Sequence, residues 1–172
     1  MVKKRGQVWI ETVTYTLVAF VLIGLVISFA KPKIEELQDK STIEQTINLL
    51  KELNSVISEV QNMGEGNKRE LEIKVREGEL EINSSNESII FYFEGKYLYS
   101  EPDILYEEGG LKFLSEEKGK FYSLTITKEY SELNLTYEGQ EVKKNLPRSN
   151  SAYNVFITNK GGQPNQIDFE IE

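Results

Sequence analysis

The stretch of sequence that decides the fold is residues 12–30, TVTYTLVAFVLIGLVISFA, whose 19 residues carry no charge. At about 1.5 Å per residue, a helix of this length is about 28 Å long, which is close to the thickness of the hydrocarbon layer of a bilayer. Lys31 and Lys33 follow the stretch and mark its far boundary. The sequence therefore predicts one membrane-spanning helix near the N-terminus.

The charges on the two sides of this helix predict its orientation. Lys3-Lys4-Arg5 precede it on a very short tail, whereas Lys31 and Lys33 follow it. Positive charge is enriched in cytoplasmic segments, and the cluster of three therefore favours a cytoplasmic N-terminus. The rest of the chain would then lie outside the cell.

Three triplets agree with an external location, because they match the acceptor pattern for N-linked glycans. They begin at Asn83, Asn86 and Asn134, each of which has Ser or Thr two positions later. Such triplets also arise by chance in loops that contain Asn and Ser. We treat these asparagines as candidate glycosylation sites.

Two simpler interpretations of the apolar stretch stay open. Ser28-Phe29-Ala30 has the small-x-small pattern that a signal peptidase accepts, which would make the stretch a cleaved secretory signal. The apolar run is longer than the roughly 7–15 residues of an ordinary signal core, and Pro32 follows closely. The other interpretation is a signal-anchor that is never cleaved.

The composition limits the functions that the rest of the chain can have. The 172 residues are 39% hydrophobic, which is enough for a core, and 20 basic against 28 acidic residues give a net charge of -8. That balance argues against nucleic-acid binding, which relies on basic patches. Cysteine and histidine are absent, so disulfides, thiol chemistry and histidine general bases are excluded. We predict no catalytic, cofactor or metal site, although an enzyme that uses carboxylates alone remains conceivable.

A second, amphipathic stretch continues the helix from Ile34 to about Met63. Pro32 is expected to bend the helix at the membrane boundary. Beyond it the apolar residues are spaced by threes and fours, at Ile43, Ile47, Leu50, Leu53, Ile57 and Val60. Leu49 and Val56 widen this apolar face, either for contact with neighbouring subunits or for the chain's own domain. Gly64 and Gly66 predict the end of the helix.

Beyond Lys68 the apolar period drops to two, which is typical of half-buried strands. We predict hairpins that turn at 76–79 and at Glu94-Gly95, and a closing hairpin that turns at 159–165. The predicted strands are 71–75, 80–82, 89–93, 96–99, 111–114, 121–127, 132–137, 155–158 and 167–171. The fold class is therefore α+β, a long N-terminal hydrophobic helix followed by an antiparallel β-sandwich-like domain.

Two groups of side chains in this domain suggest binding sites only weakly. Glu107-Glu108 and Glu116-Glu117 lack the spaced pattern of a calcium loop and are typical of solvated turns. The tyrosines could form an aromatic platform for glycans or partners, but tyrosine is also a favoured strand residue. They stand at Tyr92, Tyr97, Tyr99, Tyr106, Tyr122 and Tyr130.

The N-terminal array carries a family resemblance. Lys3-Lys4-Arg5-Gly6, followed by Gln7, by Glu11 four residues later and by the apolar helix, resembles the class III signal sequence of type IV pilin-like proteins. Archaeal pilins and archaellins are the most similar. The resemblance implies that a prepilin peptidase cuts between Gly6 and Gln7 on the cytoplasmic side. Glu11 would become the fifth mature residue, which in bacterial relatives pairs with the free amine of a neighbouring subunit.

The resemblance also implies a domain organisation and a function. Residues 1–6 would be the leader, 7–63 the helix (7–30 in the membrane or filament core, 31–63 amphipathic) and 68–172 an extracellular domain. We expect a non-enzymatic subunit of a surface filament for adhesion or motility, held in the cell membrane as a precursor. Its partners would be the membrane, the prepilin peptidase and further copies or other pilins, and not nucleic acid.

Some observations depart from this pattern, and two alternatives remain. Trp9 and Tyr15 stand where some archaeal pilins have smaller or aliphatic residues. A membrane-anchored binding module would keep residues 1–6 and would not polymerise. A secreted soluble domain, such as a carbohydrate binder or a carboxylate enzyme, would lack everything before Lys31.

Overall fold

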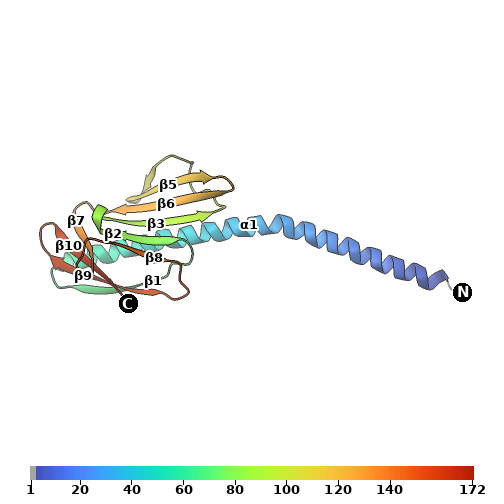
Figure 1. The fold of residues 1–172 in the computed structure, drawn as a ribbon, viewed down its shortest axis with the longest axis horizontal. Coiled ribbons are helices and arrows are strands. Elements are labelled where there is room, and N and C mark those ends of the chain that lie inside the picture. The colour runs from blue at the N-terminus through green and yellow to red at the C-terminus, as the bar shows by residue number, and fades with distance from the viewer. Residues whose placement is uncertain (1–2) are drawn as a thin grey trace.

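The computed structural model describes the backbone of residues 3–172 and side chains from Val8 onward (Figure 1). It confirms the α+β fold class, since one long helix precedes a strand-rich domain. The elements are α1 (Lys3–Met63), β1 (Lys68–Ile73), β2 (Glu79–Asn83), the 3₁₀ turn η1 (Ser84–Asn86), β3 (Ser88–Gly95), β4 (Tyr106–Glu108), β5 (Leu111–Lys118), β6 (Phe121–Glu129), β7 (Leu133–Tyr137), β8 (Lys143–Pro147), β9 (Tyr153–Gly161) and β10 (Asn165–Ile171).

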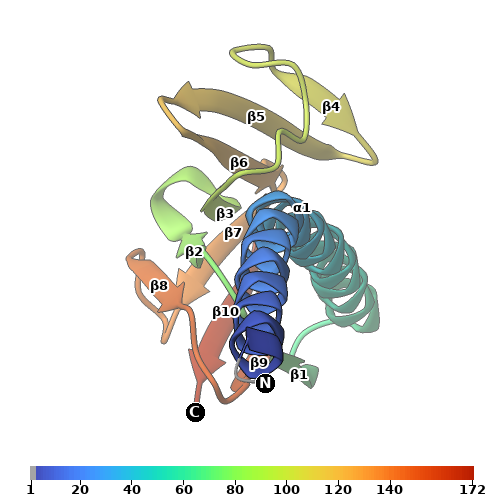
Figure 2. The ribbon, with the colours of Figure 1, turned by 90° about the vertical axis from the view of Figure 1, so that its right-hand side faces the viewer.

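Helix α1 has 61 residues and divides into two arms. In the projecting arm, residues 8–34, every residue is exposed, whereas the packed arm, residues 35–63, contains the helix's buried residues. The two arms meet at an angle (Figures 1 and 2). Pro32 lies inside the helix, where a missing backbone donor favours a bend.

The domain consists of two sheets. The four-stranded sheet has the order β1-β9-β10-β7, and the six-stranded sheet has the order β4-β5-β6-β3-β2-β8. Every pair of neighbours is antiparallel except β10 and β7, which are parallel. The chain leaves β7 for β8 in the other sheet before it returns to β9 and β10, and this crossover permits the parallel pair.

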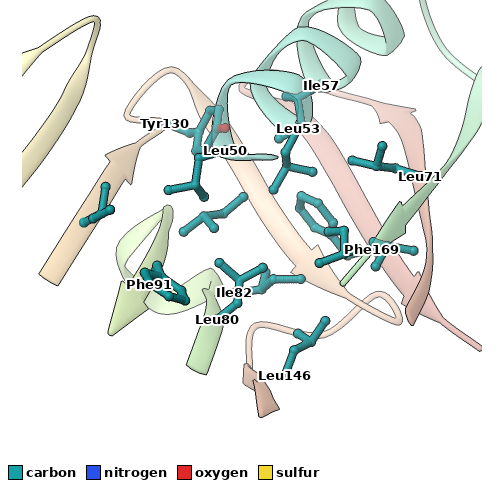
Figure 3. Close-up of a cluster of buried hydrophobic side chains, with 14 of the residues drawn as sticks. Leu50, Leu53, Ile57, Leu71, Leu80, Ile82, Phe91, Tyr130, Leu146 and Phe169 are labelled. Carbon is teal, nitrogen blue, oxygen red and sulfur yellow. The ribbon is translucent and has the colours of Figure 1, made fainter. Parts of the chain in front are cut away.

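The packed arm fills the space between the sheets. Leu50, Leu53 and Ile57 are each 1% exposed and belong to one buried cluster with side chains of both sheets, including Phe91 and Phe169 (Figure 3). Leu49 and Val56 are partly buried and pack against the same core. Of the two roles that the sequence left open for those residues, contact with the chain's own domain is therefore observed.

The first predicted hairpin is wrong. β1 pairs with β9, and β2 pairs with β3 and β8, so the two segments belong to different sheets. The turn between them is a crossover, in which Gly78 has a φ of +78° and a Cβ atom there would clash with the Tyr92 carbonyl oxygen. Alternation predicts that one strand face is buried, but not which sheet the strand joins.

The second predicted hairpin is also wrong, because residues 96–99 form no strand after β3. The Lys96 backbone N–H donates to Asp39 Oδ2 of the helix at 2.5 Å, and this contact replaces a ladder bond. β3 pairs instead with β2 and β6. The closing hairpin of β9 and β10 is confirmed, while β4 and β8 were not predicted.

Candidate functional site: the projecting arm

The projecting arm exposes a large continuous apolar surface. Its large hydrophobic side chains range from 38% exposed at Val13 to 77% exposed at Phe29. Within the described residues, α1 is the one helix long and apolar enough to span a bilayer, and 0% of its most apolar window is buried. Contiguous apolar surface of this extent marks a site of contact with a membrane or with other protein.

The serine and threonine hydroxyls of the arm are satisfied by the helix itself. Each of them donates to the backbone carbonyl four residues earlier. The bonds are Thr12 to Val8 at 2.9 Å, Thr14 to Ile10 at 2.8 Å, Thr16 to Thr12 at 2.9 Å and Ser28 to Gly24 at 2.8 Å. Because no water is needed to complete these bonds, the arm suits an apolar surrounding.

Two amphipathic rings and an acidic side chain lie near the N-terminal end of the arm. Trp9 and Tyr15 are 71% and 73% exposed, and rings of this type favour the interface between lipid and water. Glu11 lies between them on the exposed surface. Gly6 and Gln7, the predicted cleavage site, have helical backbone, and the side chain of Gln7 lies outside the described part of the chain.

The apolar surface extends beyond the charged boundary of the predicted span. Ile34 and Leu37 are 52% and 66% exposed, although Lys31 and Lys33 precede them. Those lysines pair within the helix, Lys31 with Glu35 at 3.9 Å and Lys33 with Glu36 at 2.6 Å. The exposed apolar surface thus continues beyond Lys31, where the predicted membrane span ends.

A clamp between the domain and the helix fixes where the projecting arm leaves the domain. The Lys96 ammonium contacts the Glu35 carboxylate, and this hydrogen bond lowers the pKa of Glu35. The Lys96 backbone N–H binds Asp39, as described above. At Gly95 a Cβ atom would lie 2.6 Å from Asp39 Oδ2 and 2.6 Å from Phe93 Cε1, so a larger residue there would have to displace these side chains.

The three candidate glycosylation sites differ in how exposed their asparagine side chains are. Asn83 is 1% exposed and its Nδ2 donates to Glu81 Oε1 at 2.9 Å, so the folded chain does not present it for modification. Asn134 is partly buried, with a buried Oδ1 atom. Asn86 is exposed at the end of η1. Of the three asparagines, Asn86 is the one that a glycan could reach in the folded domain.

The tyrosines do not form one platform. Tyr130 is buried, which raises the pKa of its phenol, whereas Tyr92 is exposed on β3. Tyr99 and Tyr106 both pack against Phe113, with ring centroids 5.1 Å and 5.9 Å from that ring. Within residues 8–172 no three acidic side chains are grouped to hold a metal ion.

Two further features of the domain were not predicted from the sequence. A hollow of about 490 Å³ lies beside β4, lined by Tyr99, Ile104 and Tyr106 together with Glu101 and Glu108. The exposed pair Ile104-Leu105 was the available signal for it.

The other feature is Asp168, a carboxylate that is 2% exposed. Its Oδ1 accepts hydrogen bonds from Thr136 Oγ1 at 2.6 Å and from the Gly139 backbone N–H at 2.7 Å. These bonds satisfy the buried charge and hold the turn after β7. Its role is therefore structural.

Comparison with models of known protein families, with curated proteins and with solved structures found no match for this chain.

Proposed function

We propose that this chain is the structural subunit of a type IV pilus-like surface filament. It is inserted in the cell membrane as a precursor, with its N-terminus in the cytoplasm and residues 68–172 outside. A prepilin peptidase removes residues 1–6. The mature chain then polymerises through the projecting arm, and its activity is assembly rather than catalysis.

The observation that carries the proposal is the division of α1. The packed arm completes the core of the domain, whereas the projecting arm makes no buried contact within the described chain and satisfies its own serine and threonine hydroxyls. A surface of that kind requires lipid before assembly, and in a filament it would be covered by the arms of other copies.

Ile34 and Leu37 favour assembly over a plain membrane anchor. An anchor needs apolar surface only inside the bilayer, and Lys31 and Lys33 mark its end. The two exposed apolar side chains beyond those lysines gain nothing in water. Packing between neighbouring helices would cover these two side chains and remove their apolar surface from water.

The energetics of assembly depend on close fit, because lipid tails are as apolar as the arm itself. Apart from the local helix backbone, a Cβ atom added at Gly24 would have no atom within 4 Å, so a neighbouring helix could approach the backbone closely there. Glu11 is the arm's acidic residue near its N-terminal end. By resemblance it would meet the free amine of Gln7 in a neighbouring subunit, an attraction that is strong only when both charges leave water together.

The test is the mass and N-terminal sequence of the chain purified from cells that contain a prepilin peptidase. The proposal predicts a mature terminus at Gln7, and an unprocessed chain when Gly6 is replaced by valine. A Glu11→Gln chain should be processed but form fewer filaments. A terminus at Lys31 would indicate a secreted domain, and retention of residues 1–6 would indicate an anchor; either result would contradict the proposal.

A further inference from the structure

The six-stranded sheet ends in two edge strands, β4 and β8. In the described chain β4 pairs only with β5, and β8 pairs only with β2. Figure 2 shows β4 at the outer limit of this sheet, with β8 on the far side of β2. An unpaired edge presents backbone donors and acceptors that can join another strand.

The two edges carry opposite charge. Glu107 and Glu108 are exposed on β4, while Lys143 is exposed and Lys144 half-buried on β8. Each edge also has an exposed apolar residue close to the charged pair: Leu105, 62% exposed, stands two positions before Glu107, and Val142, 39% exposed, directly precedes Lys143. The edges therefore match each other in charge and in apolar character.

The directions of the strands match as well. All five pairings in the six-stranded sheet are antiparallel, so its first and last strands run in opposite directions. If two copies lie side by side in the same orientation, β4 of one and β8 of the next are antiparallel. Copies whose helices are parallel could thus continue one antiparallel sheet.

We propose that β4 of one copy pairs with β8 of a second copy, with Glu107-Glu108 opposite Val142-Lys143-Lys144. This contact is heterologous, so it leaves a free β8 and a free β4 at the two ends and can add further copies. It deepens the proposed function by giving the outer domains a contact of their own, and it rests on that function for the tethering of the copies.

Charged edge strands are also a common protection against aggregation, and Pro147 on β8 serves that purpose at one position. Protection by a single sign of charge would repel every copy. Opposite signs repel β4 from β4 and β8 from β8, but they leave the β4–β8 pairing favourable. The charge pattern therefore selects one arrangement of two copies.

The dimensions limit how this contact coexists with packing of the arms. Six strands at about 4.8 Å separate equivalent points of paired copies by about 29 Å, whereas packed helices lie about 8–10 Å apart. The arms of paired copies must therefore converge towards their N-termini, or must pack against different neighbours. β4 has only 3 residues, so the contact needs the high local concentration that tethered copies provide.

Because the chain has no cysteine, introduced thiols can report this contact without background. Leu105→Cys and Asn145→Cys together place one thiol near each edge, and oxidation of membranes or filaments from cells that make this variant should give a ladder of covalent multimers. Leu105→Cys with Glu70→Cys, on edge strand β1 of the other sheet, is the matched control and should give no ladder. E107K/E108K should abolish the ladder, and adding K143E/K144E should restore it.

A separate Val21→Cys chain tests the arms, because its oxidation gives dimers only when projecting arms touch. Arm dimers without an edge ladder would overturn the edge pairing and leave the proposed function intact. An edge ladder without arm dimers would support the pairing and count against assembly through the arm. A ladder that persists in E107K/E108K, or that forms equally in the Glu70 control, would also overturn the proposal.

Discussion

The two arms of α1 share one continuous helix but differ in the surface that surrounds them. Residues 12–30 of the projecting arm carry no charge on any face, as expected for a helix that lies in lipid or among other helices. The packed arm is apolar along one face, from Ile43 to Val60, and that face is buried by the domain. The comparison shows that hydrophobic periodicity distinguishes a helix that packs within the chain from one that must pack outside it.

The largest difference between the arms should appear in the stability of the domain. Replacing Leu53 by alanine removes a side chain that is 1% exposed and should cost about 2–5 kcal/mol of unfolding free energy. The matched change Leu22→Ala lies in the projecting arm, where the side chain is 56% exposed, and should leave the domain's unfolding unchanged. Urea unfolding of the full chain in detergent micelles measures both. Equal losses would mean that the arms do not differ in this way.

Leu22→Arg should change the membrane insertion of the projecting arm and leave the stability of the domain unchanged. A charged residue at the centre of a membrane helix costs about 2.5–3.5 kcal/mol of insertion free energy. We expect the variant to be released from membranes by alkaline extraction, while the unfolding midpoint of its domain stays that of the unmodified chain. A variant that stays membrane-embedded, or whose domain unfolds, would contradict the division into arms.

A smaller effect is expected at the junction between the arms. In Gly95→Ala the new methyl group would collide with Asp39 and Phe93, and overpacking of this kind costs about 1–3 kcal/mol. Gly24→Ala is the control in the projecting arm, since no atom outside the local helix backbone lies within 4 Å of the new Cβ position. Thermal unfolding should separate the two variants, and a neutral Gly95→Ala would show that the clamp can relax.

The smallest effect concerns the pH dependence of the same clamp. The hydrogen bond from Lys96 lowers the pKa of Glu35 from its ordinary value of 4.5. A carboxyl group with a lowered folded pKa stabilises the fold above its unfolded pKa, and this contribution is lost as the pH falls through the folded pKa. The difference in unfolding midpoint between the unmodified chain and Lys96→Gln should therefore be larger at pH 7 than at pH 3.

Lys120→Gln, a change in the turn between β5 and β6, is the control for that titration. Glu170 also has a pKa lowered by a lysine, Lys68, so the Lys96→Gln and Lys120→Gln chains should both lose some stability in acid. The informative quantity is the difference in unfolding midpoint between Lys96→Gln and Lys120→Gln. A difference that does not depend on pH would show that Lys96 acts through packing alone.

The sequence was sufficient for the helix and for the β9–β10 hairpin, because both are set by local patterns. It was insufficient for β1 and β2, whose alternation is the same whether they pair with each other or join different sheets. The loss of a strand after Gly95 depends on Asp39, which lies 57 residues before Lys96 in the chain. No local signal reports such a contact.

The sequence also did not predict which polar side chains are buried. Asn83 matches a surface glycosylation triplet, yet it is the last residue of β2 and is buried. Asp168 has the sequence pattern of an exposed polar position in an alternating strand, but its carboxylate is buried against β7. The residue type and the strand pattern therefore do not predict the burial at either position.

The most direct test of the account is to locate the projecting arms in material sheared from cells that make the chain and a prepilin peptidase. The account predicts filaments in which electron cryomicroscopy finds the arms packed at the centre, about 8–10 Å apart, with the strand domains outside. Recovery of the chain solely in the membrane, as single copies whose arms touch only lipid, would contradict it.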